Sequence, residues 1–294
     1  MVAVVVAGAN GKVGQLLIPR LKQRGHRVIA LVRSAAVPDA EVVIPDWTSG
    51  AVTSLPPFDV IVNLTGDINP PRRSGYHAAN SETAERLAAL AAGRPHHAVY
   101  ISFPGARADA ANAYLATKGR AEDVTRSAAG TATILRTTII CGTPDAPLDS
   151  DQRMQAASGK AARSFGSGQV RLRPVYIGDV VDAVVVAVER TINGTYGLEG
   201  PDVVTLDDLL RMLNRDPRKP IAHTPGWLVR LLGRFIGLRR DFIDIMLADQ
   251  LGRDPDFFGA AGITQPRSLI ELWQPGLGRF AGPGESAKVA ASQP

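Results

Sequence analysis

The first fourteen residues constrain the fold of this chain more than any other stretch. Residues 2–6 are all Val or Ala and carry no charge, which is typical of a strand buried on both faces of a parallel sheet. Gly8, Gly11 and Gly14 follow at three-residue spacing, and apolar residues between Leu16 and Leu21 then recur with a helical period. The sequence therefore predicts a strand, a glycine-rich turn and a helix in that order.

This order is the one that a dinucleotide-binding site requires. The glycines let a pyrophosphate approach the backbone, and the first N–H groups of the helix attract it together with the helix dipole. The residues expected to contact the cofactor are Gly8, Asn10, Gly11, Lys12, Val13 and Gly14. The alternative is a tight turn that binds nothing, and the second apolar run over residues 27–32 favours the binding site over it.

Length and composition indicate a globular protein. The 294 residues can form one large domain, or one domain with a smaller lobe. Cys141 is the single cysteine, so an intramolecular disulfide is excluded, and no second thiol or His cluster offers a structural metal site. No apolar run approaches the ~20 residues of a membrane span. The N-terminus lacks the basic region of a signal peptide, so we expect a cytoplasmic protein.

The net charge of +5 is unevenly distributed. Residues 211–240 contain eight Lys or Arg side chains and one acidic side chain, Asp216, so the rest of the chain is slightly acidic. The basic character belongs to one segment rather than to the nucleotide-binding body, which argues against nucleic acid as a partner.

Short apolar runs alternate with helical patterns through the first half of the chain. We expect strands over residues 27–32, 42–44, 58–64 and 98–102, and helices over residues 80–92 and 114–124. This alternation predicts an α/β fold with a doubly wound parallel Rossmann sheet, whose ligands bind at the carboxyl ends of the strands. At the end of the fourth strand, Leu64, Thr65 and Gly66 are expected to bring the backbone close to the cofactor.

The end of the second strand decides the choice of cofactor. An acidic residue there would bind the ribose 2′-hydroxyl of NAD, whereas an Arg suits the 2′-phosphate of NADP. Arg33 occupies this position and Ser34 adds a hydroxyl, so the sequence favours NADP(H) over NAD(H). The alternative is an Arg that is simply solvated at a strand end. Asp46, after the third strand, could approach the adenine.

Tyr114 and Lys118 lie four residues apart in a predicted helix and hence on one face. A phenol with a pKa near ~10 is a poor base at neutral pH, and a nearby ammonium group would lower that pKa enough for proton transfer. The pair is expected to act as a general acid/base. The alternative is a chance Tyr and Lys on a surface helix.

With these motifs the chain resembles the short-chain dehydrogenase/reductase superfamily, in its extended or atypical branch, over about residues 1–200. The resemblance implies that Tyr114 and Lys118 are the catalytic pair and that Lys118 also binds the nicotinamide ribose. It implies that Asn80 orders a proton-relay water. Members that perform redox chemistry carry Ser or Thr after the fifth strand, where this chain has Ser102 followed by Phe103 and Pro104. Ser102 either orients a substrate carbonyl or only ends the strand.

A finer resemblance connects the chain with atypical members related to the nucleotide-binding accessory subunit of respiratory complex I and with NmrA-like NADP-binding proteins. It rests on the Ser-Phe-Pro-Gly-Ala run over residues 102–106, on Tyr114 and Lys118, and on residues 200–205. In some of these relatives the nucleotide is structural or sensed.

The second half of the chain is expected to form a small, mostly helical lobe on the substrate side. We place an NAD(P)-binding domain at residues 1–142, the lobe at 143–280 with the last Rossmann elements at about 174–200 interleaved, and a disordered tail at 281–294. Residues 225–240 read as a basic amphipathic helix. They either pack on the lobe with solvated Arg side chains or contact a membrane surface or a protein complex. The sequence is also compatible with a homodimer.

Two functions remain open from the sequence. The first is an NADP(H)-dependent oxidoreductase or epimerase of unknown small-molecule substrate, with Tyr114, Lys118, Ser102 and Asn80 at its catalytic site. The second is a non-catalytic NADP(H)-binding protein, structural or redox-sensing, that acts through a complex or a membrane surface. A sugar-nucleotide epimerase would use NAD, so Arg33 argues against it.

Overall fold

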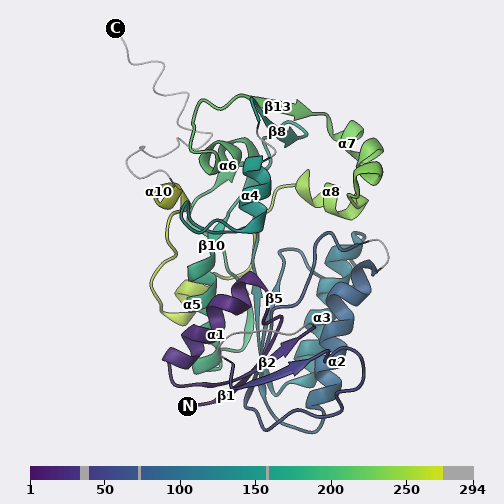
Figure 1. The fold of residues 1–294 in the computed structure, drawn as a ribbon, viewed down its shortest axis with the longest axis vertical. Coiled ribbons are helices and arrows are strands. Elements are labelled where there is room, and N and C mark those ends of the chain that lie inside the picture. Colours follow the sequence, from purple (N-terminus) through teal and green to yellow (C-terminus); the bar gives the residue numbers. More distant parts are fainter. Residues whose placement is uncertain (34–39, 72–73, 157–158, 274–294) are drawn as a thin grey trace.

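The computed structural model describes residues 1–33, 40–71, 74–156 and 159–273 (Figure 1). Within them, a seven-stranded sheet forms the centre of the molecule, and all of its neighbouring strands pair in parallel. In spatial order the strands are β11 (Gly194–Gly197), β6 (Thr131–Arg136), β5 (His97–Ser102), β4 (Val60–Asn63), β1 (Ala3–Ala7), β2 (Arg27–Val32) and β3 (Val42–Pro45). This order confirms the predicted doubly wound α/β fold.

The strand β1 is buried on both faces, as its uncharged sequence predicts. Val4 and Val6 belong to the core on one face, and Val5 and Ala7 belong to the core on the other face. The alternation follows from the two-residue period of a strand. Its last residue, Ala7, pairs with Leu31 on one side and with Asn63 on the other. The carboxyl ends of β1, β2 and β4 are therefore adjacent.

Helices cover both faces of the sheet (Figure 1). Three helices pack on the face of the sheet that carries Val4 and Val6. They are α1 (Lys12–Gln23), α5 (Ile177–Arg190) and the short α9 (Phe257–Ala261). The other face carries the π-helical turn η1 (His77–Ser81), α2 (Glu82–Ala91) and α3 (Ala113–Ala128). The helix predicted over residues 80–92 thus begins with a π-helical turn three residues earlier.

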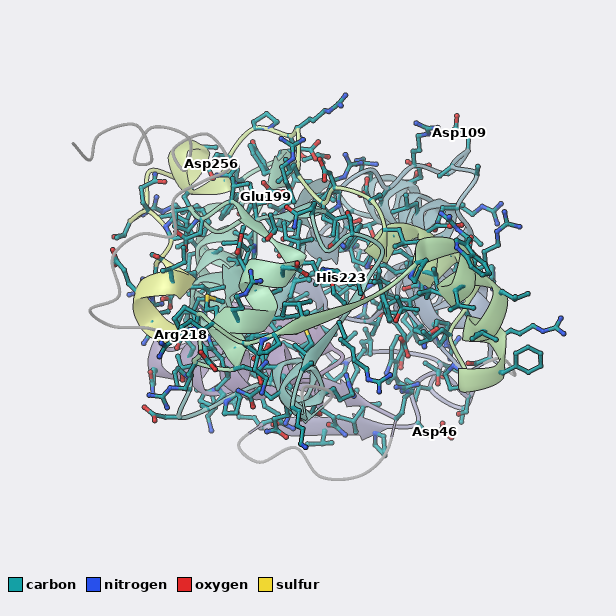
Figure 2. All side chains as sticks on the ribbon, turned by 90° about the horizontal axis from the view of Figure 1, so that it is seen from above. Asp46, Asp109, Glu199, Arg218, His223 and Asp256 are labelled. Atoms are coloured by element: carbon teal, nitrogen blue, oxygen red, sulfur yellow. The ribbon has the colours of Figure 1, made fainter. Side chains whose placement is uncertain are left out.

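The remaining elements form a small lobe above the carboxyl ends of the strands (Figure 1). Its helices are α4 (Asp149–Ala156), α6 (Leu206–Leu213), α7 (Gly226–Leu232), the 3-10 helix η2 (Gly233–Ile236), α8 (Arg240–Met246) and α10 (Leu269–Trp273). Three two-stranded sheets pair β10 (Val175–Tyr176) with β7 (Ile140–Cys141), β12 (Val204–Thr205) with β9 (Arg171–Leu172), and β13 (Ile221–Thr224) with β8 (Ala162–Phe165). In Figure 2, which views the molecule from above this lobe, His223 of β13 lies near the centre and Asp46 near the lower edge.

The lobe differs from the prediction in two respects. Residues 143–173, in a lobe expected to be mostly helical, contain the strands β8 and β9 besides the helix α4, because each strand pairs with a segment far along the chain. Residues 225–240 form α7 and η2, and the chain then turns into α8, which periodicity did not indicate. At the start of α6, Thr205 and Asp208 form a capping box.

The domain boundaries at residues 142 and 280 stay predictions, and the predicted tail at 281–294 lies outside the described residues. Within the part of the chain that the structure describes, no helix is long and apolar enough to cross a membrane.

Candidate functional site

A pocket of about 540 Å³ opens at the carboxyl ends of β1, β2 and β4. Its size is within the range of small-molecule sites, which run from about 300 to 1,000 Å³. The lining residues include Gly8, Asn10 and Gly11 from the glycine turn, Arg33 from the end of β2, and Leu64, Thr65 and Gly66 from the end of β4. Seven of the predicted cofactor contacts therefore meet in one pocket.

The glycine turn presents backbone rather than side chains to this pocket. Gly8 has a φ of +82°, in the left-handed region that favours glycine. The Gly11 N–H donates to the Gly8 carbonyl at 2.9 Å and closes the turn. A β-carbon on Gly14 would lie 2.6 Å from the carbonyl oxygens of Gly8 and Ala9, so only glycine lets α1 begin this close to the turn.

The first turn of α1 faces an anion favourably. The first N–H groups of a helix have no acceptor within the helix, and this first turn contains no acidic residue. The predicted contacts Lys12, Val13 and Gly14 lie in this first turn but are not among the residues that line the pocket. Val13 packs against the core, and Lys12 reaches Asp149 at the start of α4, with an Nζ–Oδ1 distance of 3.3 Å. The backbone and dipole of α1 thus fit a phosphate group.

Arg33 is exposed and lines the pocket on the side of β2. Ser34 lies outside the described residues. Beyond Arg33 the pocket wall is formed by Trp47 and Thr48 rather than by Asp46, which has a φ of +48° and is absent from the lining. Arg86 of α2 fixes this loop, because its guanidinium donates to the Trp47 carbonyl at 3.3 Å and to the Val52 carbonyl.

Hydrogen bonds fix the end of β4 against α2. The Thr65 hydroxyl is 2.6 Å from both Asn63 Oδ1 and the Thr83 hydroxyl. Thr83 in turn donates to the Asn80 carbonyl at 2.9 Å. The chain of contacts holds Leu64 to Gly66 in place as a wall of the pocket.

Asn80, Gly66 and Lys118 meet at the edge of the pocket. A β-carbon on Gly66 would lie 3.0 Å from Asn80 Oδ1 and 3.2 Å from Lys118 Nζ. Asn80 is fully buried, and its side chain bonds both the N–H and the carbonyl of Asp67 as well as the Tyr76 carbonyl. In this structure Asn80 shapes the loop that follows Gly66.

Lys118 lies almost entirely inside the protein, with 4% exposure. Its ammonium group donates to the Ile101 carbonyl at 2.7 Å and lies 4.2 Å from the centre of the Tyr100 ring. Burial lowers the pKa of Lys118 to about 7, against a smaller raising effect of the Glu122 charge. The cation expected to activate Tyr114 is therefore itself weakened by burial.

Tyr114 lies in the first turn of α3, in a helix that Asn112 caps by accepting the N–H groups of Tyr114 and Leu115. Its ring packs edge-on against Phe103, with centroids 5.5 Å apart, and Ile245 of α8 belongs to the same apolar cluster. Burial raises the pKa of the Tyr114 phenol, and the charge of Asp67 raises it further. The net shift of the Tyr114 pKa is thus upward, opposite in direction to the lowering expected from Lys118.

Ser102 is buried at the end of β5, and its hydroxyl donates to Glu122 Oε1 at 2.6 Å. Glu122 also accepts from Arg136 through two bonds of 2.8 and 2.9 Å and from Arg126 at 2.9 Å. The Ser102 proton is thus engaged by a buried ionic network. A role of Ser102 in catalysis stays a prediction.

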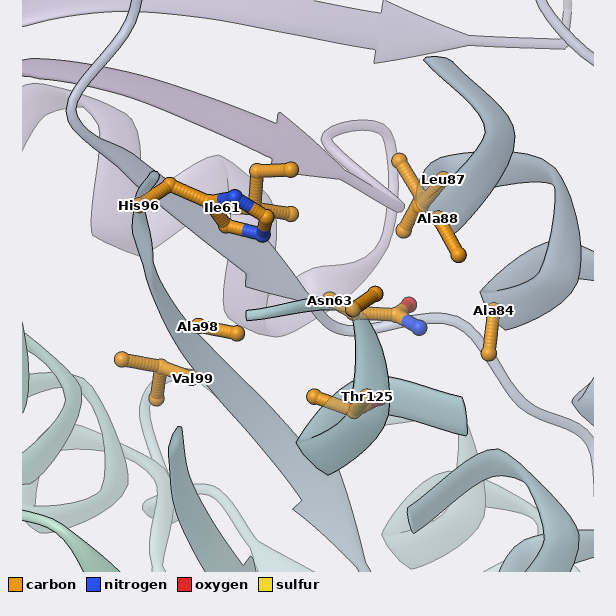
Figure 3. A pocket seen from close by; sticks show the side chains of 10 residues that line it. Ile61, Asn63, Ala84, Leu87, Ala88, His96, Ala98, Val99 and Thr125 are labelled. Carbon is orange, nitrogen blue, oxygen red and sulfur yellow. The ribbon is translucent and has the colours of Figure 1, made fainter. Parts of the chain in front are cut away.

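A second, much smaller cavity of about 20 Å³ lies between the sheet and the helices α2 and α3 (Figure 3). The Asn63 side chain points into it, and the Asn63 Nδ2 group has no hydrogen-bond partner among the residues that the structure describes. The volume suffices for about one water molecule, so it cannot hold a substrate. Among the described residues, there is also no group of three or more His, Cys, Asp or Glu side chains that could hold a metal ion.

Several lining residues were not predicted. Trp47, Thr48 and Arg86 extend the pocket beyond Arg33, and the loop with Pro70 and Pro71 forms its opposite rim. Trp47, three residues after the third predicted strand, was a usable signal, because the end of that strand lies beside Arg33. Arg86 carried no such signal, since a helix arginine most often faces solvent.

The chain is similar to several known proteins. Residues 4–197 match the sequence profile of the NAD dependent epimerase/dehydratase family. The mitochondrial NADH dehydrogenase (ubiquinone) 1 alpha subcomplex subunit 9 of Arabidopsis thaliana is 28% identical over 230 residues, which cover 72% of this chain and 57% of that protein. The mitochondrial NADH-ubiquinone oxidoreductase 40 kDa subunit of Neurospora crassa is 27% identical over 85% of this chain and 69% of its own length.

Two further similarities are informative. A ceramide reductase of Caulobacter vibrioides is 29% identical over 48% of this chain and 47% of that protein. Among solved structures, a human epimerase family protein crystallised with NADPH superposes with a TM-score of 0.72 at 19% identity, covering 92% of this chain and 98% of the other. At this identity the superposition shows a shared fold.

Proposed function

The chain belongs to the NAD dependent epimerase/dehydratase family, whose NAD(P)-binding fold it has, and we propose that it binds NADP(H) in the pocket at the ends of β1, β2 and β4. The observation that carries the proposal is the meeting of the glycine turn and Arg33 in one pocket. The Gly8–Gly11 turn and the first turn of α1 would hold the pyrophosphate. Arg33 would pair with the 2′-phosphate, which NAD lacks.

We infer that the nucleotide is held as a structural or redox-sensing ligand rather than turned over. The groups that would perform proton transfer are engaged within the protein: Ser102 with Glu122, and Lys118 with the Ile101 carbonyl. Burial raises the pKa of Tyr114, and Phe103 and Ile245 pack around its ring, where a substrate would have to approach. Two of the relatives are named as subunits of a mitochondrial NADH dehydrogenase and of a mitochondrial NADH-ubiquinone oxidoreductase, which supports action through a protein complex.

An oxidoreductase or epimerase is the second candidate. The i, i+4 placement of Tyr114 and Lys118 on α3 favours it, because a β-carbon on Gly66, which lines the pocket, would lie 3.2 Å from Lys118 Nζ. The family name and the relative named as a ceramide reductase point to the same class. Bound nicotinamide would supply hydride chemistry, and Tyr114 would exchange the proton with a substrate oxygen.

A turnover test separates the holding role from a reductase. Protein loaded with NADPH is mixed with aldehydes, ketones and long-chain keto lipids, and the fluorescence of the reduced nicotinamide is followed. We expect NADPH to remain reduced in both the wild type and Tyr114→Phe. Oxidation by the wild type that Tyr114→Phe abolishes would contradict the holding role and establish the enzyme.

A further inference from the structure

Four large apolar side chains stand exposed on one short segment of the upper lobe. Trp227, Leu231, Leu232 and Phe235 are 67%, 58%, 46% and 69% exposed. They make up half of the eight exposed large hydrophobic residues that the described parts of the chain contain. We call these four side chains the apolar patch. Isolated exposed apolar residues are common on proteins, but such a cluster indicates a binding surface.

The arrangement of α7 and η2 explains why the patch faces outward. Val229 is buried, and a β-carbon on Gly233 would clash with Ile243 of α8, so this side of the segment packs tightly on α8. Trp227 and Leu231 are four residues apart in α7, which places them on a common face away from Val229, and the exposed Phe235 follows in η2. The patch is therefore an outer face of a segment whose inner face is already covered.

Positive charge surrounds the apolar patch. Arg230, Arg234 and Arg240 are exposed beside it. The Arg234 guanidinium lies 4.6 Å from the centre of the Phe235 ring. Arg230 and Arg240 share one carboxylate, Asp244, at 2.8 and 3.7 Å, and so keep excess positive charge between them.

The neighbouring helix α8 does not cancel this charge. Residues 226–246 contain four arginines against two aspartates. The second aspartate is Asp241. Its carboxylate accepts a hydrogen bond from the Ala113 N–H at the start of α3. The segment thus combines an apolar face with a positive border.

We propose that the apolar patch, with Arg230, Arg234 and Arg240, docks this protein onto a membrane surface that contains anionic phospholipids. Indole and phenyl rings favour the depth of the lipid headgroups, and leucine side chains favour the acyl boundary below them. Arginine pairs with phosphate groups through two parallel hydrogen bonds. This inference concerns the action at a membrane surface that the sequence left open, and it names the class of lipid that the surface contains. The expected lipid binding does not depend on nucleotide binding.

The observations favour a lipid surface over a second copy of the chain. Four partly exposed side chains offer on the order of a few hundred Å², whereas a stable interface buries about 800 Å² on each partner. In a symmetric dimer the patch would also face its own copy and bring the arginines of both copies together. An anionic surface satisfies the apolar and the charged groups at once.

The test is co-sedimentation with vesicles of pure phosphatidylcholine and with vesicles containing about 30% phosphatidylglycerol. We expect the wild type to bind the anionic vesicles at least about tenfold more strongly, and to be released by salt. Trp227→Ser combined with Phe235→Ser should reduce binding by about tenfold or more. Val203→Ser is the matched control, because Val203 is 45% exposed outside the patch, and it should bind like the wild type.

Three results would overturn the proposal: no vesicle binding by the wild type, equal binding by the patch variant, or light scattering that shows a wild-type dimer and a monomeric patch variant. NADPH calorimetry of the patch variant accompanies the test and should match the wild type. A loss of NADPH binding in both proteins would refute the proposed function and leave the vesicle result standing.

Discussion

The Ser102 hydroxyl donates a 2.6 Å hydrogen bond to the carboxylate of Glu122, which is 2% exposed and bridges Arg126 and Arg136. The position after β5 is where the family resemblance implies a hydroxyl that orients a substrate. Here that hydroxyl instead satisfies a buried charge, and the contact connects the end of β5 with α3. The relationship favours a structural role for Ser102 over a catalytic one.

Ser102→Ala should therefore lower stability without affecting nucleotide binding. A hydrogen bond to a charged group contributes about 1.5–3 kcal/mol, and Glu122 keeps its arginine partners, so we expect a loss near the lower limit. Urea unfolding measures the stability, and calorimetry with NADPH measures the binding. Unchanged stability together with weaker NADPH binding would contradict the structural role.

Glu122→Gln should lower the free energy of unfolding more than Ser102→Ala does. Removing the charge leaves Arg136, which is 17% exposed in its side chain, with Asp254 as its remaining carboxylate. Breaking a buried ion pair from one side costs about 3–5 kcal/mol. The control is Asp123→Asn in the same helix, because Asp123 is 63% exposed and pairs with Arg126 at the surface. Equal losses in the two variants, again by urea unfolding, would refute the importance of the network.

The core of the fold was predictable from the sequence because patterns of neighbouring residues determine it. The uncharged run before Gly8 and the spacing of Gly8, Gly11 and Gly14 define β1 and the start of α1, and the position of Arg33 follows from the end of β2. Of these residues, Gly8, Gly11 and Arg33 do meet in one pocket.

The rest depends on contacts between distant segments, which no local pattern contains. Ser102 and Glu122 are twenty residues apart, and Ile245 of α8 joins the apolar cluster that contains Tyr114. Strands of two residues, such as β9, are too short to show a period. Burial of Tyr114 and Lys118 is set by these contacts, so their pKa values could not be inferred from the spacing alone.

Lys118 should make stability depend on pH. Burial lowers its pKa to about 7, whereas the unfolded chain keeps a value near ~10.4. Between these values the unfolded state binds more protons, so this group makes stability rise with pH, by at most about 1.4 kcal/mol per pH unit.

We expect Lys118→Met to lose this gain between about pH 7.5 and about pH 9.5, when urea unfolding is repeated across that window. Lys22→Met, at an exposed position of α1, serves as the control and should keep the wild-type slope. Identical slopes in the wild type and Lys118→Met would contradict the shifted pKa.

Arg239 should support the pocket from a distance. Its guanidinium donates to the carbonyls of Pro70 and Pro71 at 2.8 and 3.0 Å, and both prolines line the pocket. Without these bonds the loop spends less time in the conformation that forms the pocket, so Arg239→Ala should weaken NADPH binding about three- to tenfold. Arg240→Ala, whose side chain is 85% exposed, should leave the affinity unchanged, and an equal effect of both variants would refute the role of Arg239.

The most direct test of the account is calorimetric titration of NADPH and NADH into the wild type, Arg33→Ala and Arg27→Ala. Arg27 is exposed at the opposite end of β2 and controls for the loss of a charge. We predict that the wild type binds NADPH more tightly than NADH, and that Arg33→Ala weakens NADPH alone by about 10- to 100-fold while Arg27→Ala changes neither. Binding of neither nucleotide, or NADPH binding that is insensitive to Arg33, would contradict the assignment of the pocket to NADP(H).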